Sequence, residues 1–158
     1  MSSAADPAGT ALSADFEQRL AARFRDRPIY RFLEFELLLI ELDRCVVAID
    51  FHERFDNGGG TIHGGVLCML ADTAVACALS TNFDGRMGFA TSNLNIHFLR
   101  RARGRIVADA RIIKKGSTVC VGSVDMTDDA GALVASITCD FILTTSKLPP
   151  RSEGAVPP

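Results

Sequence analysis

The chain has 158 residues, 47% of them hydrophobic and 23% charged, so it is long enough for one domain with a substantial core and too short for two. Seventeen basic and 19 acidic residues leave a net charge of −2, which gives no electrostatic reason to bind nucleic acid or an anionic membrane. The apolar share excludes a disordered chain, and 13 Gly with 6 Pro exclude a collagen-like one.

The N-terminal part is expected to be a flexible segment followed by a short helix. Residues 1–14 are rich in Ser, Ala and Gly, a composition typical of loose termini. Residues 15–25 carry an apolar residue at every fourth position with charges between them, which predicts an amphipathic helix. Its apolar residues are Phe16, Leu20 and Phe24. Ser13 or Asp15 is expected to cap its first turn.

Two strands, a glycine-rich loop and a second helix are expected next. Strands are predicted at residues 34–42 and 45–53. Residues 54–65 (RFDNGGGTIHGG) contain five glycines and cannot form regular structure. The apolar run that follows has helical spacing and predicts a helix at about residues 64–80.

The apolar run from Gly64 to Phe83 could be mistaken for a membrane span. Asp72 is its only charged residue, and an acid at the centre of a membrane helix costs about 2.5–3.5 kcal/mol on insertion scales. We therefore expect a buried helix in a soluble domain and no membrane partner.

Everything after residue 86 is predicted to be strand, in four segments. In the first, one apolar face alternates with a more polar one: Ala90, Ser92, Leu94, Ile96 and Phe98 against Phe89, Thr91, Asn93, Asn95 and His97. Strands at 105–113 and 118–127 follow, and a turn at residues 128–131 precedes a last, strictly alternating strand. The Pro-rich residues 146–158 are expected to be a flexible tail.

This order of elements predicts an α+β domain. The long helix is apolar on nearly every side, so another element must cover it. A single curved antiparallel sheet can do so.

The five cysteines predict no disulfide framework. Their number is odd and no pair has C-x-x-C spacing, which also argues against a zinc ribbon. Most of them lie in apolar runs, where a free cysteine behaves as a small hydrophobic residue. With no secretory signal at the N-terminus, a reducing cytoplasm is the expected location.

The glycine loop and the helix after it carry the chemistry. The loop leads into a helix start at His63, Gly64 and Gly65, where free N–H groups and the helix dipole can bind a developing negative charge. Asp72 is a lone carboxylate in an apolar run, which is costly unless it has a partner or a function.

Each of these features has a simpler explanation when taken singly. A Gly run is most often a turn, a lone His is most often structural, and a buried Asp often binds a loop amide. The loop lacks the Gly-Lys-Ser/Thr ending of a P-loop, there is no G-x-S-x-G motif, and three widely spaced histidines predict no metal site. Together, the loop, the helix start and the isolated acid favour acyl-transfer chemistry.

These motifs resemble the signature of hotdog-fold acyl-CoA thioesterases, most closely the phenylacetate-pathway (PaaI-like) branch. The resemblance is carried by residues 57–67 (NGGGTIHGGVL), 70–74 (LADTA) and 91–100 (TSNLNIHFLR), and it covers roughly residues 30–144. It implies a hotdog fold in a domain at 15–145, with an antiparallel sheet of about six strands wrapped around one long central helix. Family members work as homodimers or as homotetramers built from dimers.

The resemblance also implies roles for five residues. Asp72 would be the general base or the nucleophile, and the Gly64 amide would polarise the thioester carbonyl. Asn57 would position the attacking water or the carbonyl, and His63 would support the loop and the thioester. Thr91 matches a hydroxyl position that some members use to orient water.

No metal or other cofactor is expected, since coenzyme A is part of the substrate. The basic residues near strand ends that could meet its phosphates are Arg100, Arg101, Arg103, Lys114 and Lys115, with Gly65 and Gly116 as further substrate contacts. A solvated charged edge that discourages aggregation explains each basic residue equally well.

The expected function is therefore hydrolysis of an acyl-CoA, with an aryl, short-chain or medium-chain acyl group, to the free acid and coenzyme A. One alternative is a non-catalytic hotdog module that binds acyl-CoA as a sensor or scaffold. A hotdog dehydratase or hydratase is a second, but its motifs are absent from the sequence.

Helix geometry adds an expectation about assembly. Gly64 and Asp72 are eight residues apart, which is ~12 Å along one helix. A carboxylate and an oxyanion donor that act on the same carbonyl must both lie within about 3 Å of the reacting atoms. We therefore expect each active site to be shared between two subunits whose helices lie antiparallel across a two-fold axis.

Overall fold

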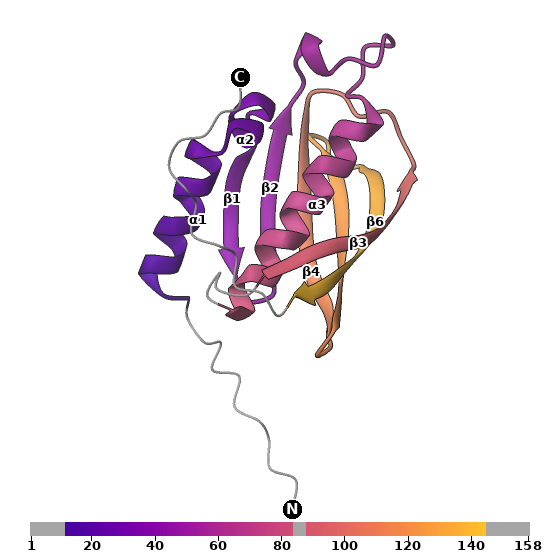
Figure 1. Ribbon diagram of the computed structural model, residues 1–158. Coiled ribbons are helices and arrows are strands. Elements are labelled where there is room, and N and C mark those ends of the chain that lie inside the picture. The colour runs from indigo at the N-terminus through magenta and orange to yellow at the C-terminus, as the bar shows by residue number, and fades with distance from the viewer. Residues whose placement is uncertain (1–11, 84–87, 145–158) are drawn as a thin grey trace, which may run out of the picture.

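The computed structural model describes residues 12–83 and 88–144, which form an antiparallel sheet curved around one long helix (Figure 1). The six strands are β1 (Glu36–Glu41), β2 (Arg44–Asp50), β3 (Gly88–Phe98), β4 (Arg105–Lys115), β5 (Val119–Asp128) and β6 (Leu133–Thr144). They lie in the order β1-β2-β4-β5-β6-β3, and every neighbouring pair is antiparallel. The predicted α+β architecture, with a sheet of six strands wrapped around a central helix, is confirmed.

The central helix α3 (Gly64–Ser80) has the bounds that the sequence predicts. It packs on β2, β4 and β5, and most of its side chains are buried. Gly122 of β5 lies directly beneath Val75, and a Cβ atom at Gly122 would overlap the Val75 side chain. The glycine therefore allows the helix to lie close to the middle of the sheet.

The fold explains the apolarity of the Gly64–Phe83 segment without a membrane. By length and composition this segment could cross a membrane, with a mean hydropathy of 1.5. However, 61% of its apolar stretch is buried inside the domain. Such burial is that of a core helix. The expectation of a buried helix is therefore confirmed.

At the N-terminal end, helix α1 (Ala14–Asp26) agrees with the predicted amphipathic helix. Ser13 provides the cap, because its hydroxyl accepts a hydrogen bond from the Phe16 N–H at 3.1 Å. The three apolar residues predicted to face inward are buried in the core. Together with α2 (Pro28–Leu33), this helix lies beside β1 at one end of the sheet (Figure 1).

Helix α2 was not expected, and it shortens the first predicted strand. Pro28 occupies its first turn, where the missing N–H costs nothing, and Glu34 ends it in the left-handed region with φ of 54°. The strand predicted from residue 34 therefore begins at Glu36. The second predicted strand was expected to reach residue 53 but ends at Asp50, because residue 53 already belongs to a 3₁₀ turn (Glu53–Phe55).

All five cysteines are free, as expected, and only Cys68 is not fully buried. Of the segments expected to be flexible, residues 146–158 lie outside the described residues. So do residues 1–11, whereas residues 12–14 lead into and begin α1.

Candidate active site

The glycine-rich loop before α3 is a defined turn built on two side chains. Asp56 Oδ1 accepts hydrogen bonds from the N–H groups of Gly60 at 2.8 Å and Thr61 at 3.1 Å. Asn57 Oδ1 accepts from the Gly59 N–H at 2.8 Å, and the Asn57 N–H donates to the Thr61 carbonyl. Gly60 has a φ of 71°, which favours glycine. These bonds fix Asn57 at the start of the turn, on the surface beside the helix.

The start of α3 offers one N–H group that is free to bind an anion. His63 caps the helix through Nδ1, which accepts from the Gly65 N–H at 3.0 Å. Within the described part of the chain, nothing accepts from the Gly64 N–H. The positive end of the helix dipole strengthens this donor. His63 thus holds the first turn of the helix, so the Gly65 amide is occupied while the Gly64 amide remains available.

A pocket of about 480 Å³ opens beside this helix start. It is lined by Asn57, Thr61, Ile62, Gly64, Leu67, Phe98, Leu99, Arg100, Arg101 and Ala102. The Phe98 ring lies over Gly64, where a Cβ atom would come within 2.9 Å of it, so a larger residue at Gly64 would require the ring to move. Of the predicted site residues, the structure brings Asn57, Gly64, Arg100 and Arg101 together around this pocket. Asp72 is not among the lining residues.

Asp72 lies elsewhere, in a hydrogen-bonded cluster between α3 and the edge of the sheet. The Thr91 hydroxyl of β3 donates to Asp72 Oδ1 at 2.6 Å. The Cys139 thiol of β6 lies 3.8 Å from the same oxygen. Nothing in residues 12–83 or 88–144 donates to Asp72 Oδ2, which leaves that oxygen available for substrate or water.

A bulge in β3 brings Thr91 to Asp72. Thr91 pairs with Phe141 and Leu94 pairs with Cys139, and the two partners on β6 are both buried on the helix side of the sheet. The register shifts between Thr91 and Asn93, so β3 contains one extra residue there. The strict alternation expected from the sequence would place Thr91 and Leu94 on opposite faces. That expectation is wrong, because the bulge turns both side chains toward α3.

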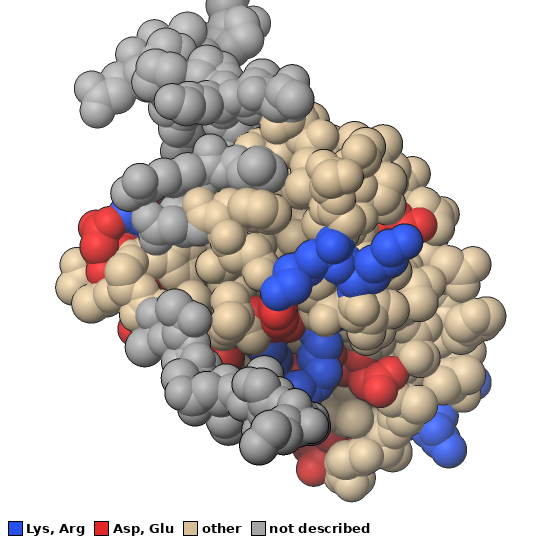
Figure 2. Space-filling view, turned by 90° about the horizontal axis from the view of Figure 1, so that it is seen from below, with Lys and Arg blue, Asp and Glu red and all other residues tan. Residues whose placement is uncertain are grey.

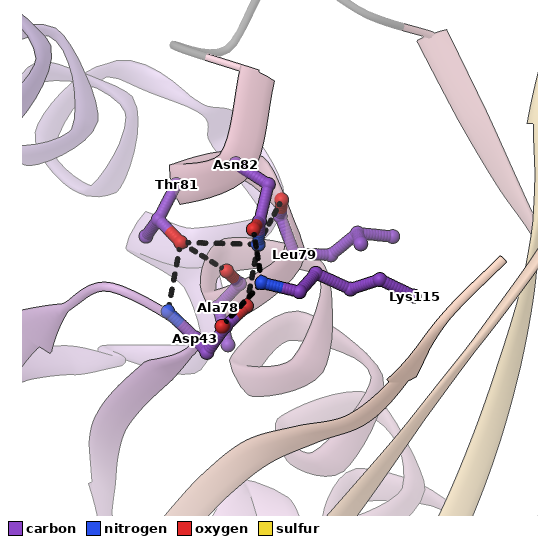
Figure 3. A network of polar contacts seen from close by, with 6 residues as sticks. All are labelled: Asp43, Ala78, Leu79, Thr81, Asn82 and Lys115. Carbon is purple, nitrogen blue, oxygen red and sulfur yellow. Dashed lines mark hydrogen bonds and ion pairs between the residues drawn. The ribbon is translucent and has the colours of Figure 1, made fainter. Parts of the chain in front are cut away.

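Lys115 and Gly116 lie at the other end of α3. The Lys115 ammonium forms an ion pair with Asp43 at 2.7 Å and donates to Asn82 Oδ1 at 3.0 Å (Figure 3). Gly116 shapes the β4–β5 turn, where its N–H donates to the Val119 carbonyl. Since Asn82 follows the C-terminus of α3 and Gly64 begins it, about 25 Å of helix separates Lys115 from the pocket in one protomer.

This end of the molecule carries mixed charge. Seen from below, it shows basic side chains lying beside acidic ones rather than one basic patch (Figure 2). Asp43, which pairs with Lys115, also accepts from Asn82 Nδ2 at 2.7 Å, and its N–H donates to Thr81 (Figure 3). The network joins the β1–β2 turn to the end of the helix and to the end of β4.

The sequence pattern predicts no functional role for Phe98 or Cys139. It places Phe98 on the apolar face of its strand, yet Phe98 is 53% exposed and lines the pocket. Cys139 lies in the last predicted strand, whose strict alternation puts it on the apolar face. The alternation correctly predicts that its side chain points at the helix, but only the three-dimensional fold shows that Asp72 is its neighbour.

Comparisons with known proteins identify a family to which the chain is similar. Residues 59–142 match the sequence profile of the thioesterase superfamily. Human acyl-coenzyme A thioesterase 13 is 28% identical over 130 residues, which cover 80% of this chain and 92% of that protein. The mouse protein of the same name is 31% identical over 96 residues, covering 59% of this chain and 68% of the relative.

A solved structure extends the likeness to the fold. The Escherichia coli PaaI protein of the phenylacetic acid degradation operon superposes with a TM-score of 0.78 at 22% identity, over 87% of this chain and 99% of that one. The profile match over more than half of the chain shows that the protein belongs to the thioesterase superfamily, and the superposition shows that it has the hotdog fold.

Proposed function

We propose that the protein hydrolyses an acyl-CoA thioester to a free acid and coenzyme A. The observation that carries the proposal is the environment of Asp72, a carboxylate on an apolar core helix with one oxygen bonded to Thr91 and the other without a donor among the described residues. In this reaction Asp72 either takes the proton of the attacking water or attacks the carbonyl itself. The Gly64 N–H stabilises the oxyanion, and the thiolate of coenzyme A leaves.

We propose further that each site combines Asp72 of one subunit with Gly64 of another. Helix α3 is continuous from Gly64 to Ser80, so the ~12 Å rise between the two residues holds. Asp72 also lies outside the pocket that Gly64 lines. One protomer therefore supplies the two groups to different places, whereas an antiparallel pair of helices supplies them to the same one.

The surface of α3 supports such a pairing. After the first turn of α3, the sheet leaves only Cys68, Met69, Asp72 and Ala76 less than fully buried, and these recur every three or four residues along one stripe. Met69 is 38% exposed. Pairing Asp72 with Gly64 of the partner subunit puts the two-fold axis near residue 68, midway between the two positions and within this stripe.

The edge of the sheet supports it as well. Strand β3 spans 11 residues and pairs only with β6, so its outer edge is open in the part of the chain that the structure describes. A long open edge promotes uncontrolled association unless something covers it. Antiparallel pairing of two β3 edges covers both and brings the two α3 stripes together.

Release of free coenzyme A from a panel of aryl-, short-chain and medium-chain acyl-CoA substrates tests the proposed function. We expect turnover of at least one substrate without added metal, and no loss of it in the presence of a chelator. Tight binding across the panel without hydrolysis would instead support the alternative, a non-catalytic acyl-CoA-binding protein.

We expect Arg101 to be the basic residue that contributes most to binding the phosphates of coenzyme A. Arg100 donates to the Leu133 carbonyl at 2.7 Å and Lys115 is paired with Asp43, whereas Arg101 lines the pocket and has no partner among the described residues. Arg101→Ala should raise KM by about 3- to 10-fold, as for one exposed ion pair, and change kcat little.

Lys115→Ala provides the matched comparison, because it also removes one positive charge. We expect its KM to stay within about twofold of wild type. If KM rose by this amount for Lys115→Ala and did not change for Arg101→Ala, the phosphate site would lie at the other end of the helix.

A further inference from the structure

Two donors from two different strands converge on one oxygen of Asp72. Thr91 on β3 donates to Oδ1 at 2.6 Å, and the Cys139 thiol on β6 lies 3.8 Å from Oδ1, a long and weak S–H···O contact. We propose that Cys139 is a positioning residue that holds Asp72 Oδ1 from the sheet side, so that Oδ2 points at the reacting water or carbonyl. This inference rests on the proposed thioesterase function.

The thiol is restricted to the role of donor. Cys139 is fully buried, and burial, followed by the negative charge of Asp72, raises the pKa of its thiol to about 12. It therefore keeps its proton throughout the neutral pH range. A thiolate at this position would repel the carboxylate, and the raised pKa prevents one from forming.

The sheet fixes the place of the thiol beneath the helix. Cys139 lies between Leu94 of β3 and Gly122 of β5 in the paired strands. At Gly122 the helix lies so close to the sheet that a Cβ atom there would overlap the Val75 side chain. Val75 follows Asp72 by about one helical turn. Because α3 lies this close to the sheet beside Cys139, the Asp72 carboxylate comes within reach of the Cys139 sulfur.

The two donors restrain different movements of the carboxylate. Thr91 belongs to the edge strand, and Cys139 lies one strand further into the sheet. A single bond would let the carboxylate pivot about Oδ1, whereas a second donor from another direction limits that rotation. Loss of the thiol should therefore reduce kcat, which depends on the orientation of Oδ2, more than it affects substrate binding.

Kinetics of Cys139→Ala and Cys139→Ser test this role. We expect Cys139→Ala to lower kcat by about 3- to 10-fold with KM changed less than twofold, as for the loss of one weak hydrogen bond. Cys139→Ser keeps a donor, and a buried hydroxyl without a partner is costly, so it should turn to Asp72 and retain more than about half of the wild-type kcat. Cys45→Ala is the control for the cavity, because Cys45 is equally buried on β2 and lies against Cys77.

Infrared spectroscopy of the thiol tests the contact independently of turnover. The Cys139 S–H stretching band is isolated as the difference between wild type and Cys139→Ser. In Asp72→Asn it should move to higher frequency, because a neutral amide oxygen is a weaker acceptor than a carboxylate. A band that does not move, or equal kcat for the Ala and Ser variants of Cys139, would overturn the positioning role. Absence of turnover in the wild type with a band that does shift would overturn the thioesterase function and leave the Cys139–Asp72 contact standing.

Discussion

Replacement of Asp72 with asparagine is expected to lower kcat by about 10²- to 10⁴-fold, the usual range for loss of a general base or an activated nucleophile. The amide has nearly the same shape as the carboxylate and can still accept the Thr91 hydrogen bond. We therefore expect the fold and substrate affinity to be retained. Steady-state release of coenzyme A, together with a thermal melt and an equilibrium binding measurement, checks all three.

Asp140→Asn is the matched control for this substitution. Asp140 neighbours Cys139 on β6, but its carboxylate accepts from Asn93 Nδ2 at 3.2 Å on the other face of the sheet. Removing its charge tests whether any nearby acid affects the rate, and we expect kcat to remain within about twofold of wild type. A near-normal kcat for Asp72→Asn would make Asp72 structural and the proposed mechanism wrong.

Mixed dimers of two inactive variants are expected to regain activity. In a heterodimer of Asp72→Asn with Asn57→Ala, one site receives both lesions and the other receives neither, provided that Asp72 and Asn57 reach each site from different subunits. Asn57 lines the same pocket as Gly64, and Asp72 does not. We expect the heterodimer to recover about half of the wild-type activity, because a two-fold axis generates two equal sites.

The measurement requires heterodimers isolated by two different affinity tags, with each homodimer assayed alone as a baseline. Because Asn57 lies on an exposed turn, its replacement should affect the melting temperature less than it affects kcat. Verified heterodimers that remain as inactive as the homodimers would show that each site is built within one subunit. The proposed pairing of the α3 helices would then be wrong.

Much of the fold could be predicted from local sequence patterns. The bounds of α3 follow from five glycines that exclude regular structure before it and from an apolar run with helical spacing. The cap at Ser13 and the turn at residues 128–131 also depend on neighbouring residues only. Helix α2 was missed because six residues beginning with Pro28 are too few for an amphipathic pattern to be recognised.

Local sequence patterns also identify the residues that are chemically exceptional: a glycine loop, a helix start and one acid in an apolar helix. Which of them come into contact depends on the three-dimensional packing. The β3 bulge turns Thr91 toward Asp72 against the alternation of the strand, and the approach of α3 at Gly122 brings Cys139 to the same carboxylate. Strand register and helix–sheet distance are set by packing among residues far apart in the chain, which no local pattern contains. The length of α3 likewise keeps Gly64 from Asp72 within one protomer, and this separation is the basis of the proposal that a second subunit completes each site.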